Sequence, residues 1–171
     1  MKILITGPES TGKTTISKYI STQLDATYIP EFARIYLEKN GPCYVEQDLS
    51  YFAKEHLSIY TNQNDAKLIV FDTSLIDIVV WSLYKYGRCD PWIIDQTKSL
   101  HFDLIFLTTP AVAWTEDALR ENENNREELY ALFKQQLNLV DLPYTILHAD
   151  EHKRERQVIK IINNHKDFLL Q

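Results

Sequence analysis

One glycine-containing segment near the start of the chain constrains its fold more than any other feature. Gly7-Pro8-Glu9-Ser10-Thr11-Gly12-Lys13-Thr14 fits the pattern G-x-x-x-x-G-K-[ST] of a phosphate-binding loop. A short apolar run, Ile3 to Thr6, precedes it, and a segment with Ile16, Ile20 and Leu24 on one helical face follows it. This order of strand, loop and helix predicts an α/β fold with a buried parallel strand at its start.

The residue types in this loop suit a nucleoside triphosphate. The glycines let the backbone wrap around phosphate, Lys13 brings a positive charge to the β and γ phosphates, and the Thr14 hydroxyl is a ligand for Mg²⁺. The N-terminus of the following helix adds its positive end. A chance match in a chain of 171 residues is on the order of one in a hundred. We therefore expect ATP and Mg²⁺ as cofactors, with ATP bound by Gly7, Pro8, Glu9, Ser10, Thr11, Gly12, Lys13, Thr14 and Thr15.

Four further short apolar runs predict the other strands of the sheet. They are Tyr28-Ile29, Leu68-Ile69-Val70-Phe71, Leu104-Ile105-Phe106-Leu107 and Tyr144-Thr145-Ile146-Leu147. Each is followed by helix-compatible sequence, which is typical of crossover units on a parallel sheet with helices on both faces. The last such segment, Glu151 to Leu169, is expected to be a closing helix that packs its apolar stripe on the sheet: Val158, Ile161, Ile162, His165 and Leu169.

Composition narrows the class of protein. The sequence has no repeat or linker, and 44% hydrophobic residues are enough for one core, so we expect a single domain over residues 1–171. A net charge of −6 argues against a nucleic-acid partner, because the only dense basic run is His152 to Arg156. No apolar run approaches the roughly 20 residues that span a membrane. Cys43 and Cys89 are interpreted as reduced thiols, and the chain as cytoplasmic.

Two acidic residues follow predicted strands and are candidates for the reaction centre. Asp72 ends an apolar strand, as a carboxylate near Mg²⁺ does. The alternative is that it caps the next helix. Glu31 follows the second strand, where it could take a proton from an attacking hydroxyl, and Arg34 lies three residues later. The alternative for this pair is a plain surface ion pair.

A polar stretch after the fourth strand is expected to form a lid at about residues 112–127. It holds Arg120 and Arg126, two of only 6 arginines, which could neutralise charge on a transferred phosphoryl group. A solvated charged loop is the alternative. Trp114 and Asp117 of this segment are candidate substrate contacts, whereas Trp81 is expected to lie in the core. His56 and His101 are assigned no chemistry.

Four segments together resemble a known family. In chain order they are Gly7 to Thr14, Glu31-Phe32-Ala33-Arg34-Ile35-Tyr36, Phe71-Asp72-Thr73 and Trp114-Thr115-Glu116-Asp117-Ala118-Leu119-Arg120. They resemble the kinase domain of the bifunctional bacterial NAD-biosynthesis regulator, a ribosylnicotinamide kinase. The resemblance implies a three-layer, thymidylate-kinase-like P-loop NTPase fold with strand order 2-3-1-4-5 and a short lid. It also implies phosphoryl transfer from ATP to the 5′-hydroxyl of nicotinamide riboside.

The resemblance also implies roles for individual residues. Lys13 and Thr14 would hold phosphate and Mg²⁺, and Asp72 would act at the metal or at the acceptor hydroxyl. Glu31 and Arg34 would line the acceptor side. Arg120 and Arg126 would close over the site from the lid, and Arg154 would lie near the adenine. The chain departs from the family at Pro30, where a tryptophan is common.

The sequence thus predicts a Mg²⁺-dependent kinase that acts on a small nucleoside, with nicotinamide riboside as the first candidate. Two other functions stay open: a regulatory ATPase that acts as a nucleotide-dependent switch, and a kinase whose acceptor is a nucleoside monophosphate. The low arginine count disfavours the second, because an acceptor phosphate needs cations. Association into a homo-oligomer is also left open.

Overall fold

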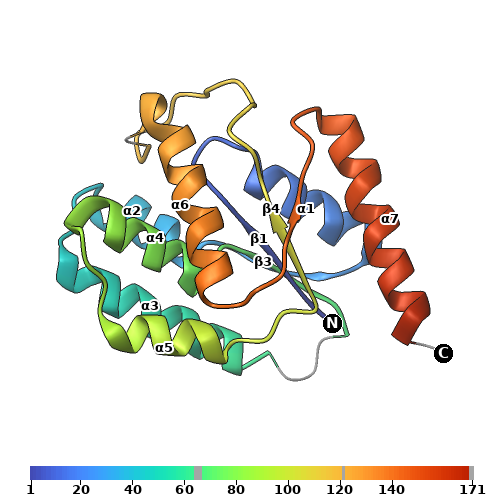
Figure 1. Cartoon of the computed structure of the whole chain (residues 1–171), viewed down its shortest axis with the longest axis horizontal. Helices are drawn as coiled ribbons and strands as arrows, with labels where there is room; N and C mark the ends of the chain where they lie inside the picture. Colours follow the sequence, from blue (N-terminus) through green and yellow to red (C-terminus); the bar gives the residue numbers. More distant parts are fainter. Residues whose placement is uncertain (64–66, 121, 170–171) are drawn as a thin grey trace.

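Five parallel strands form the central sheet of the molecule (Figure 1). The structure is a computed structural model and describes residues 1–63, 67–120 and 122–169. The order within these residues is β2-β3-β1-β4-β5, as the family resemblance implied. The strands are β1 (Lys2–Thr6), β2 (Thr27–Ile29), β3 (Ile69–Asp72), β4 (Leu104–Leu107) and β5 (Thr145–Ile146). All five predicted strands are confirmed, and their ends differ from the predicted ends by at most one residue.

Both faces of the sheet are buried, which is why its strands read as continuous apolar runs. In the central strand β1, Leu4 packs into the core on one face, and Ile3 and Ile5 pack into the core on the other. The neighbouring β4 alternates in the same way, with Ile105 on the first face and Phe106 on the second. This period of two divides the interior into two cores, one on each side of the sheet.

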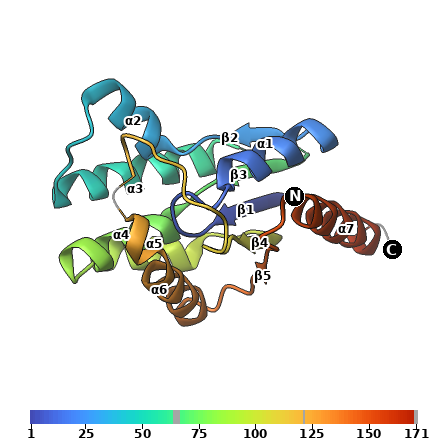
Figure 2. The ribbon, with the colours of Figure 1, turned by 90° about the horizontal axis from the view of Figure 1, so that it is seen from above.

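Helices cover each core to give three layers (Figure 2). One face carries α1 (Lys13–Leu24) and α7 (Glu151–Leu169), and on α7 Val158 and Ile162 are fully buried, as the predicted stripe requires. The Leu169 side chain of that stripe lies outside the described residues. The other face carries α2 (Phe32–Asn40), α3 (Glu46–Thr61), α4 (Leu75–Tyr86), α5 (Pro91–Ser99) and α6 (Arg126–Leu139).

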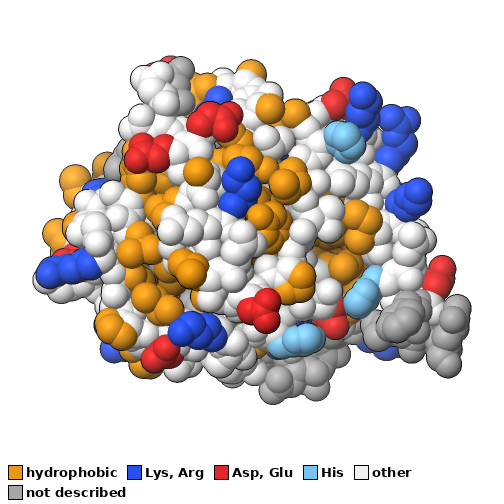
Figure 3. Space-filling view, in the orientation of Figure 1, with side chains coloured by type: hydrophobic (Ala, Val, Ile, Leu, Met, Phe, Trp, Pro, Cys, Tyr) orange, Lys and Arg blue, Asp and Glu red, His pale blue; other side chains and the backbone are white. Residues whose placement is uncertain are grey.

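The dense basic run seen in the sequence, His152 to Arg156, lies on α7. Basic side chains gather over the upper part of α7 (Figure 3), where His152, Lys153 and Arg156 are exposed. Among the described residues, no helix combines the length and the apolar character that crossing a bilayer requires. Both cysteines have free thiols.

The parallel arrangement brings the ends of three strands to one edge of the sheet. The phosphate loop follows β1, Glu31 follows β2, and Asp72 is the last residue of β3. The carboxyl edge of a parallel sheet is where ligands bind in folds of this class. The candidate site is therefore built on rigid strands, and the segment after β4 lies over it.

Candidate functional site

The two glycines of the phosphate loop occupy positions that no other residue would fit. Gly7 has a φ of 135°, and a Cβ there would lie 2.4 Å from Oγ1 of Thr108. Gly12 has a φ of 81°, and its Cβ would lie 3.0 Å from Nη1 of Arg154. Both angles are strained for residues with a side chain. The loop therefore keeps its backbone close to the end of β4 on one side and to α7 on the other.

Hydrogen bonds hold the loop in a preformed shape. The Lys13 ammonium donates to the carbonyl oxygens of Gly7, at 2.8 Å, and Pro8, at 2.9 Å. Thr11 Oγ1 donates to the Pro8 carbonyl at 2.7 Å and lies 2.6 Å from Thr108 Oγ1. The charged end of Lys13 is thus kept inside the loop, at the position that a bound phosphate group would share.

Arg154 approaches the loop from α7 rather than from open solvent. Its side chain is buried, and Nη1 donates to the carbonyl of Thr11 at 2.8 Å. Burial lowers its pKa, although it keeps its charge at neutral pH. These contacts show that Arg154 supports the backbone of the loop.

A second cluster joins α1, β2 and β3 around Asp72. The carboxyl is buried, and its Oδ2 accepts from Thr14 Oγ1 at 2.6 Å and from the Tyr28 hydroxyl at 3.0 Å. Its other oxygen, Oδ1, is buried without a hydrogen bond to the described residues. Burial, followed by the charge of Asp72, raises the pKa of Tyr28, so this hydroxyl stays protonated and donates.

This cluster fits Mg²⁺, which prefers hard oxygen ligands and keeps several waters. Thr14 Oγ1 and the carboxylate of Asp72 supply such oxygens side by side, and Asp72 Oδ1 has unused acceptor capacity. Both residues were predicted as metal ligands from the sequence. Tyr28 was missed, because a tyrosine in a short strand gives no sign of the carboxylate that it will face.

Glu31 and Arg34 lie at the start of α2 on the other side of the loop. Desolvation raises the pKa of Glu31, while the charge of nearby Lys13 acts in the opposite direction. The ion pairs of Arg34 go to Glu38, at 3.2 Å, and to Asp117 of the lid, at 3.1 Å. The Arg34 and Asp117 pair therefore ties α2 to the lid, and Glu31 is left as a carboxylate at the cleft.

Asp77, which the sequence reading did not select, is a third carboxyl close to Lys13. It lies in the first turn of α4, where its Oδ2 accepts from Thr6 Oγ1 at 3.0 Å and from the backbone N–H of Ser74 at 2.9 Å. Burial raises its pKa from 3.8 to about 7, with Lys13 opposing. The Ser-x-x-Asp spacing before an apolar helix was a signal that could have found it.

Asp77→Asn is expected to flatten the pH dependence of stability. A carboxyl with a raised pKa in the native state stabilises the fold while it is protonated, and this contribution is lost as the pH rises from about 4 to about 7. Asparagine keeps an acceptor but cannot ionise, so the loss between pH 4.5 and 8 should shrink by at most about 4 kcal/mol. Urea unfolding of both proteins at the two pH values measures this; equal losses would contradict it.

The lid packs onto the phosphate loop through Ser10 and Glu9. The backbone N–H of Thr115 donates to Ser10 Oγ at 2.8 Å, and Arg126 Nη1 donates to the Ser10 carbonyl at 3.2 Å. Arg120 Nη1 lies 3.4 Å from Ser10 Oγ, and the Asn122 N–H donates to a carboxylate oxygen of Glu9. The lid is thus closed over the loop.

The last residues of the predicted lid, at about 112–127, overlap the first turn of α6, which begins at Arg126. Glu127 and Glu128 follow Arg126 and suit the first turn of a helix. The lid segment is partly buried, since the Asn122 side chain is buried.

An open cleft with a volume of about 180 Å³ lies between the phosphate loop, the lid and the helices α2, α3 and α4. One end is polar and is formed by the loop from Glu9 to Thr15, with Arg120 above it. The other end is mainly apolar, and its main lining residues come from α2, α3, α4 and the segments beside them: Ala33, Leu37, Tyr44, Leu49, Phe52, His56, Ile78, Trp81 and Leu119. Such a cleft suits a ligand with a phosphate-accepting group at one end and a planar ring at the other.

The tryptophans Trp81 and Trp114 have different surroundings in the structure. Trp81, which was assigned to the core, packs against the core and also lines the cleft. Trp114 is outside the set of residues that line the cleft, and it contacts both lid arginines, with guanidinium to ring distances of 5.5 Å for Arg126 and 6.0 Å for Arg120. Trp114 therefore packs against both lid arginines.

The whole chain is similar to known P-loop proteins. A family model described as an AAA domain matches residues 2–156. No curated protein matches the chain. A NadR protein in complex with NAD and AMP-PNP has a TM-score of 0.80 at 22% identity, over 96% of this chain and 49% of that chain.

Two further solved structures agree with this similarity. A NadR protein in complex with NR has a TM-score of 0.77 at 18% identity, over 96% of this chain and 51% of that chain. A thymidylate kinase from Ehrlichia chaffeensis has a TM-score of 0.70 at 15% identity, over 95% of this chain and 98% of that one. The chain spans about half of each NadR chain. These likenesses confirm the three-layer P-loop fold that the sequence predicted.

Proposed function

The chain belongs to the AAA domain family, and we propose that it is an ATP- and Mg²⁺-dependent kinase. Its acceptor is the 5′-hydroxyl of a small nucleoside, with nicotinamide riboside as the first candidate. The observation that carries the proposal is the single cleft that joins the phosphate loop to an apolar aromatic end, with Glu31 in its lining. A NadR protein of the same fold binds NR, which supports this choice of acceptor.

The residues divide the work of transfer among them. Lys13 and the loop N–H groups bind and neutralise the phosphates of ATP. Thr14 and Asp72 would hold Mg²⁺, which screens phosphate charge when bound. Glu31 is the better candidate for the base, because desolvation raises its pKa toward the working range and Asp72 is occupied by two hydroxyl donors. Asp72 thus serves the metal and Glu31 the acceptor hydroxyl.

The closed lid completes the site. Arg120 and Arg126 lie against Ser10 of the loop, where positive charge would stabilise the phosphoryl group in transit and exclude water. We propose that residues 1–171 act as one kinase domain with this lid, in the cytoplasm and without a nucleic-acid partner.

One experiment separates this proposal from the two other functions. The protein is incubated with ATP and Mg²⁺ and, in turn, with nicotinamide riboside, other nucleosides, nucleoside monophosphates and water alone, and the products are identified by mass. Phosphorylated nicotinamide riboside is the expected product. ADP release without an acceptor would favour the regulatory ATPase, and nucleoside diphosphates would favour a nucleoside monophosphate kinase.

Arg120→Ala and Arg126→Ala are each expected to slow phosphoryl transfer. Loss of one donor to a developing charge costs about a hundredfold in kcat, while ATP binding by the loop remains. Single-turnover kinetics with saturating ATP measures the transfer step. Arg156→Ala, an exposed arginine on α7, is the matched control and should leave the rate unchanged. An unaltered transfer rate in both lid variants would show that the lid arginines do not act on the phosphoryl group.

A further inference from the structure

His56 is a buried imidazole at the apolar end of the cleft. It lies on α3 and is only 8% exposed, yet it is among the residues that line the cleft. Its described ring contact is the edge of Phe32, with ring centroids 6.3 Å apart at an interplanar angle of 78°. Within the described residues, no hydrogen bond involves its ring nitrogens. His56 was assigned no role from the sequence, and it is not part of the Asp72 cluster or of the lid.

The position of His56 is one where an apolar residue would be expected. Leu49, Phe52 and Ala53 are the other buried residues of α3, and with His56 they form the spacing i, i+3, i+4, i+7 of a helix face that packs on a core. The ring of Phe32 packs against the imidazole, and the other buried residues of α3 belong to the apolar core. Packing alone would therefore be served at least as well by phenylalanine.

The protonation state of the ring suits a hydrogen bond to a ligand better than an ion pair. Burial lowers the pKa of His56 to about 4, so the ring is neutral at physiological pH. A neutral imidazole presents one N–H donor and one nitrogen acceptor. The ring nitrogens are not among the side-chain atoms that are fully buried without a partner, so a ligand in the cleft can reach them and pair with them.

The partner must be flat and must carry its polar atoms on one edge. Trp81 and Phe52 border the same end of the cleft, and aromatic rings accept a planar ligand by stacking. A neutral imidazole also tolerates a positively charged ring, which a protonated histidine would repel. An amide group on the edge of the ring offers both a carbonyl acceptor and N–H donors to the imidazole.

We propose that His56 hydrogen-bonds the amide edge of the acceptor's base and thereby sets the specificity of the kinase for its nucleoside. This inference rests on the proposed function, because it concerns the acceptor end of the same cleft. Acceptors whose base lacks the amide would bind without this bond and leave the imidazole unpartnered. The discrimination would therefore appear in KM for the acceptor and not in KM for ATP.

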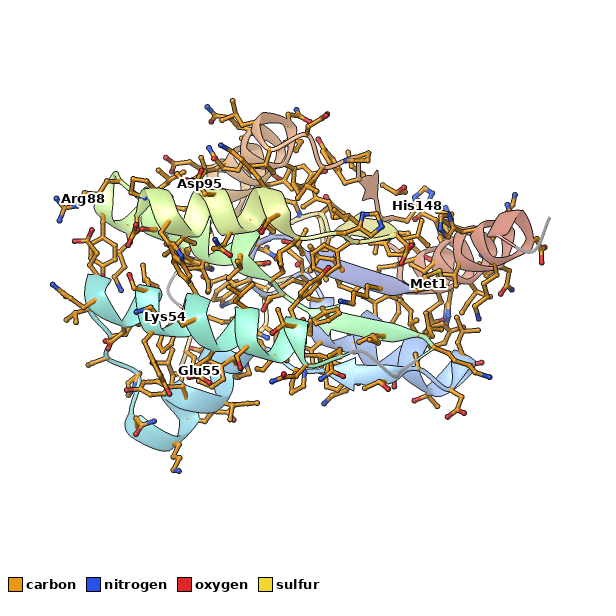
Figure 4. The ribbon with its side chains drawn as sticks, turned by 90° about the horizontal axis from the view of Figure 1, so that it is seen from below. Met1, Lys54, Glu55, Arg88, Asp95 and His148 are labelled. Atoms are coloured by element: carbon orange, nitrogen blue, oxygen red, sulfur yellow. The ribbon has the colours of Figure 1, made fainter. Side chains whose placement is uncertain are left out.

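The test compares two substitutions at His56 with a control histidine. His56→Phe keeps an aromatic ring but removes both polar atoms, whereas His56→Gln keeps a donor and an acceptor. His148→Phe is the matched control, since His148 is exposed and lies on the other side of the view from Lys54 and Glu55 of α3 (Figure 4). KM and kcat are measured with nicotinamide riboside and with pyridine riboside, which lacks the amide, and thermal unfolding is followed for every variant.

With nicotinamide riboside, His56→Phe should raise KM about tenfold to a hundredfold, with KM for ATP and the unfolding temperature unchanged or the latter higher. The same variant should leave KM for pyridine riboside unchanged, and His56→Gln should recover most of the loss. An equal loss for both ribosides, or a parallel rise in KM for ATP, would overturn the inference.

The experiment also keeps the two proposals apart. A wild-type protein that phosphorylates nicotinamide riboside, together with a His56→Phe variant of unchanged preference, would remove the role of His56 and leave the kinase in place. A wild-type protein that phosphorylates neither riboside would overturn the proposed acceptor, and with it the role of His56.

Discussion

Lys13→Ala is expected to abolish turnover of ATP while the protein stays folded. Its ammonium donates to two loop carbonyls, at 2.8 and 2.9 Å, so it is held inside the loop where the β and γ phosphates bind. Removing one such charge from a preorganised site lowers kcat about a hundredfold to a thousandfold. ADP release and product formation are measured at saturating ATP, with circular dichroism to confirm the fold.

Lys54→Ala is the matched control for this change. Lys54 is exposed on α3 (Figure 4), on a different element from the loop, and the substitution removes the same charge from the molecule. Its turnover should equal that of the wild type. Undiminished turnover in Lys13→Ala would contradict the assignment of the loop as the binding site for the phosphates of ATP.

Asp72→Asn is the second change with a large expected effect. The carboxylate accepts from Thr14 and Tyr28 through one oxygen, and the other oxygen is buried without a partner among the described residues. Asparagine keeps the size of the side chain but loses the negative charge that would hold Mg²⁺. We expect kcat to fall about a hundredfold or more and the Mg²⁺ concentration needed for half-maximal activity to rise.

The Mg²⁺ titration separates a metal role from a structural one. Asp95→Asn, an exposed carboxyl on α5, is the control and should show the wild-type Mg²⁺ dependence. If Asp72→Asn loses activity but keeps the wild-type Mg²⁺ dependence, the carboxylate acts on the acceptor hydroxyl instead. Unchanged activity would mean that the carboxylate only joins β3 to Thr14 and Tyr28.

The sequence predicted those parts of the molecule that depend on local pattern. Strands buried on both faces must be apolar throughout, so Leu104 to Leu107 was found with its full bounds. The phosphate loop was found because its backbone geometry admits only glycine at two positions, as the Thr108 contact at Gly7 shows. Element order and the loop could thus be read from residues that are close in the chain.

Side chains that meet from distant parts of the chain could not be predicted in this way. Tyr28 meets Asp72 across two strands, and the lid meets Ser10 over more than one hundred positions. The sequence around His56 did not indicate that α3 would place this side chain in the lining of the cleft. The exact start of α6 at Arg126 could not be read from the sequence, because a run of charged residues is compatible with both a loop and a first helical turn.

The contact between Arg154 and Thr11 has a consequence for how the protein is made. These residues are 143 positions apart, and the bond joins the last helix to the first loop. The strand before the loop, β1, also depends on distant parts of the chain, because it pairs with β3 and β4. Folds rich in contacts of such sequence separation form more slowly than folds built from local contacts. During synthesis, 143 further residues must follow Thr11 before Arg154 is present to support the loop.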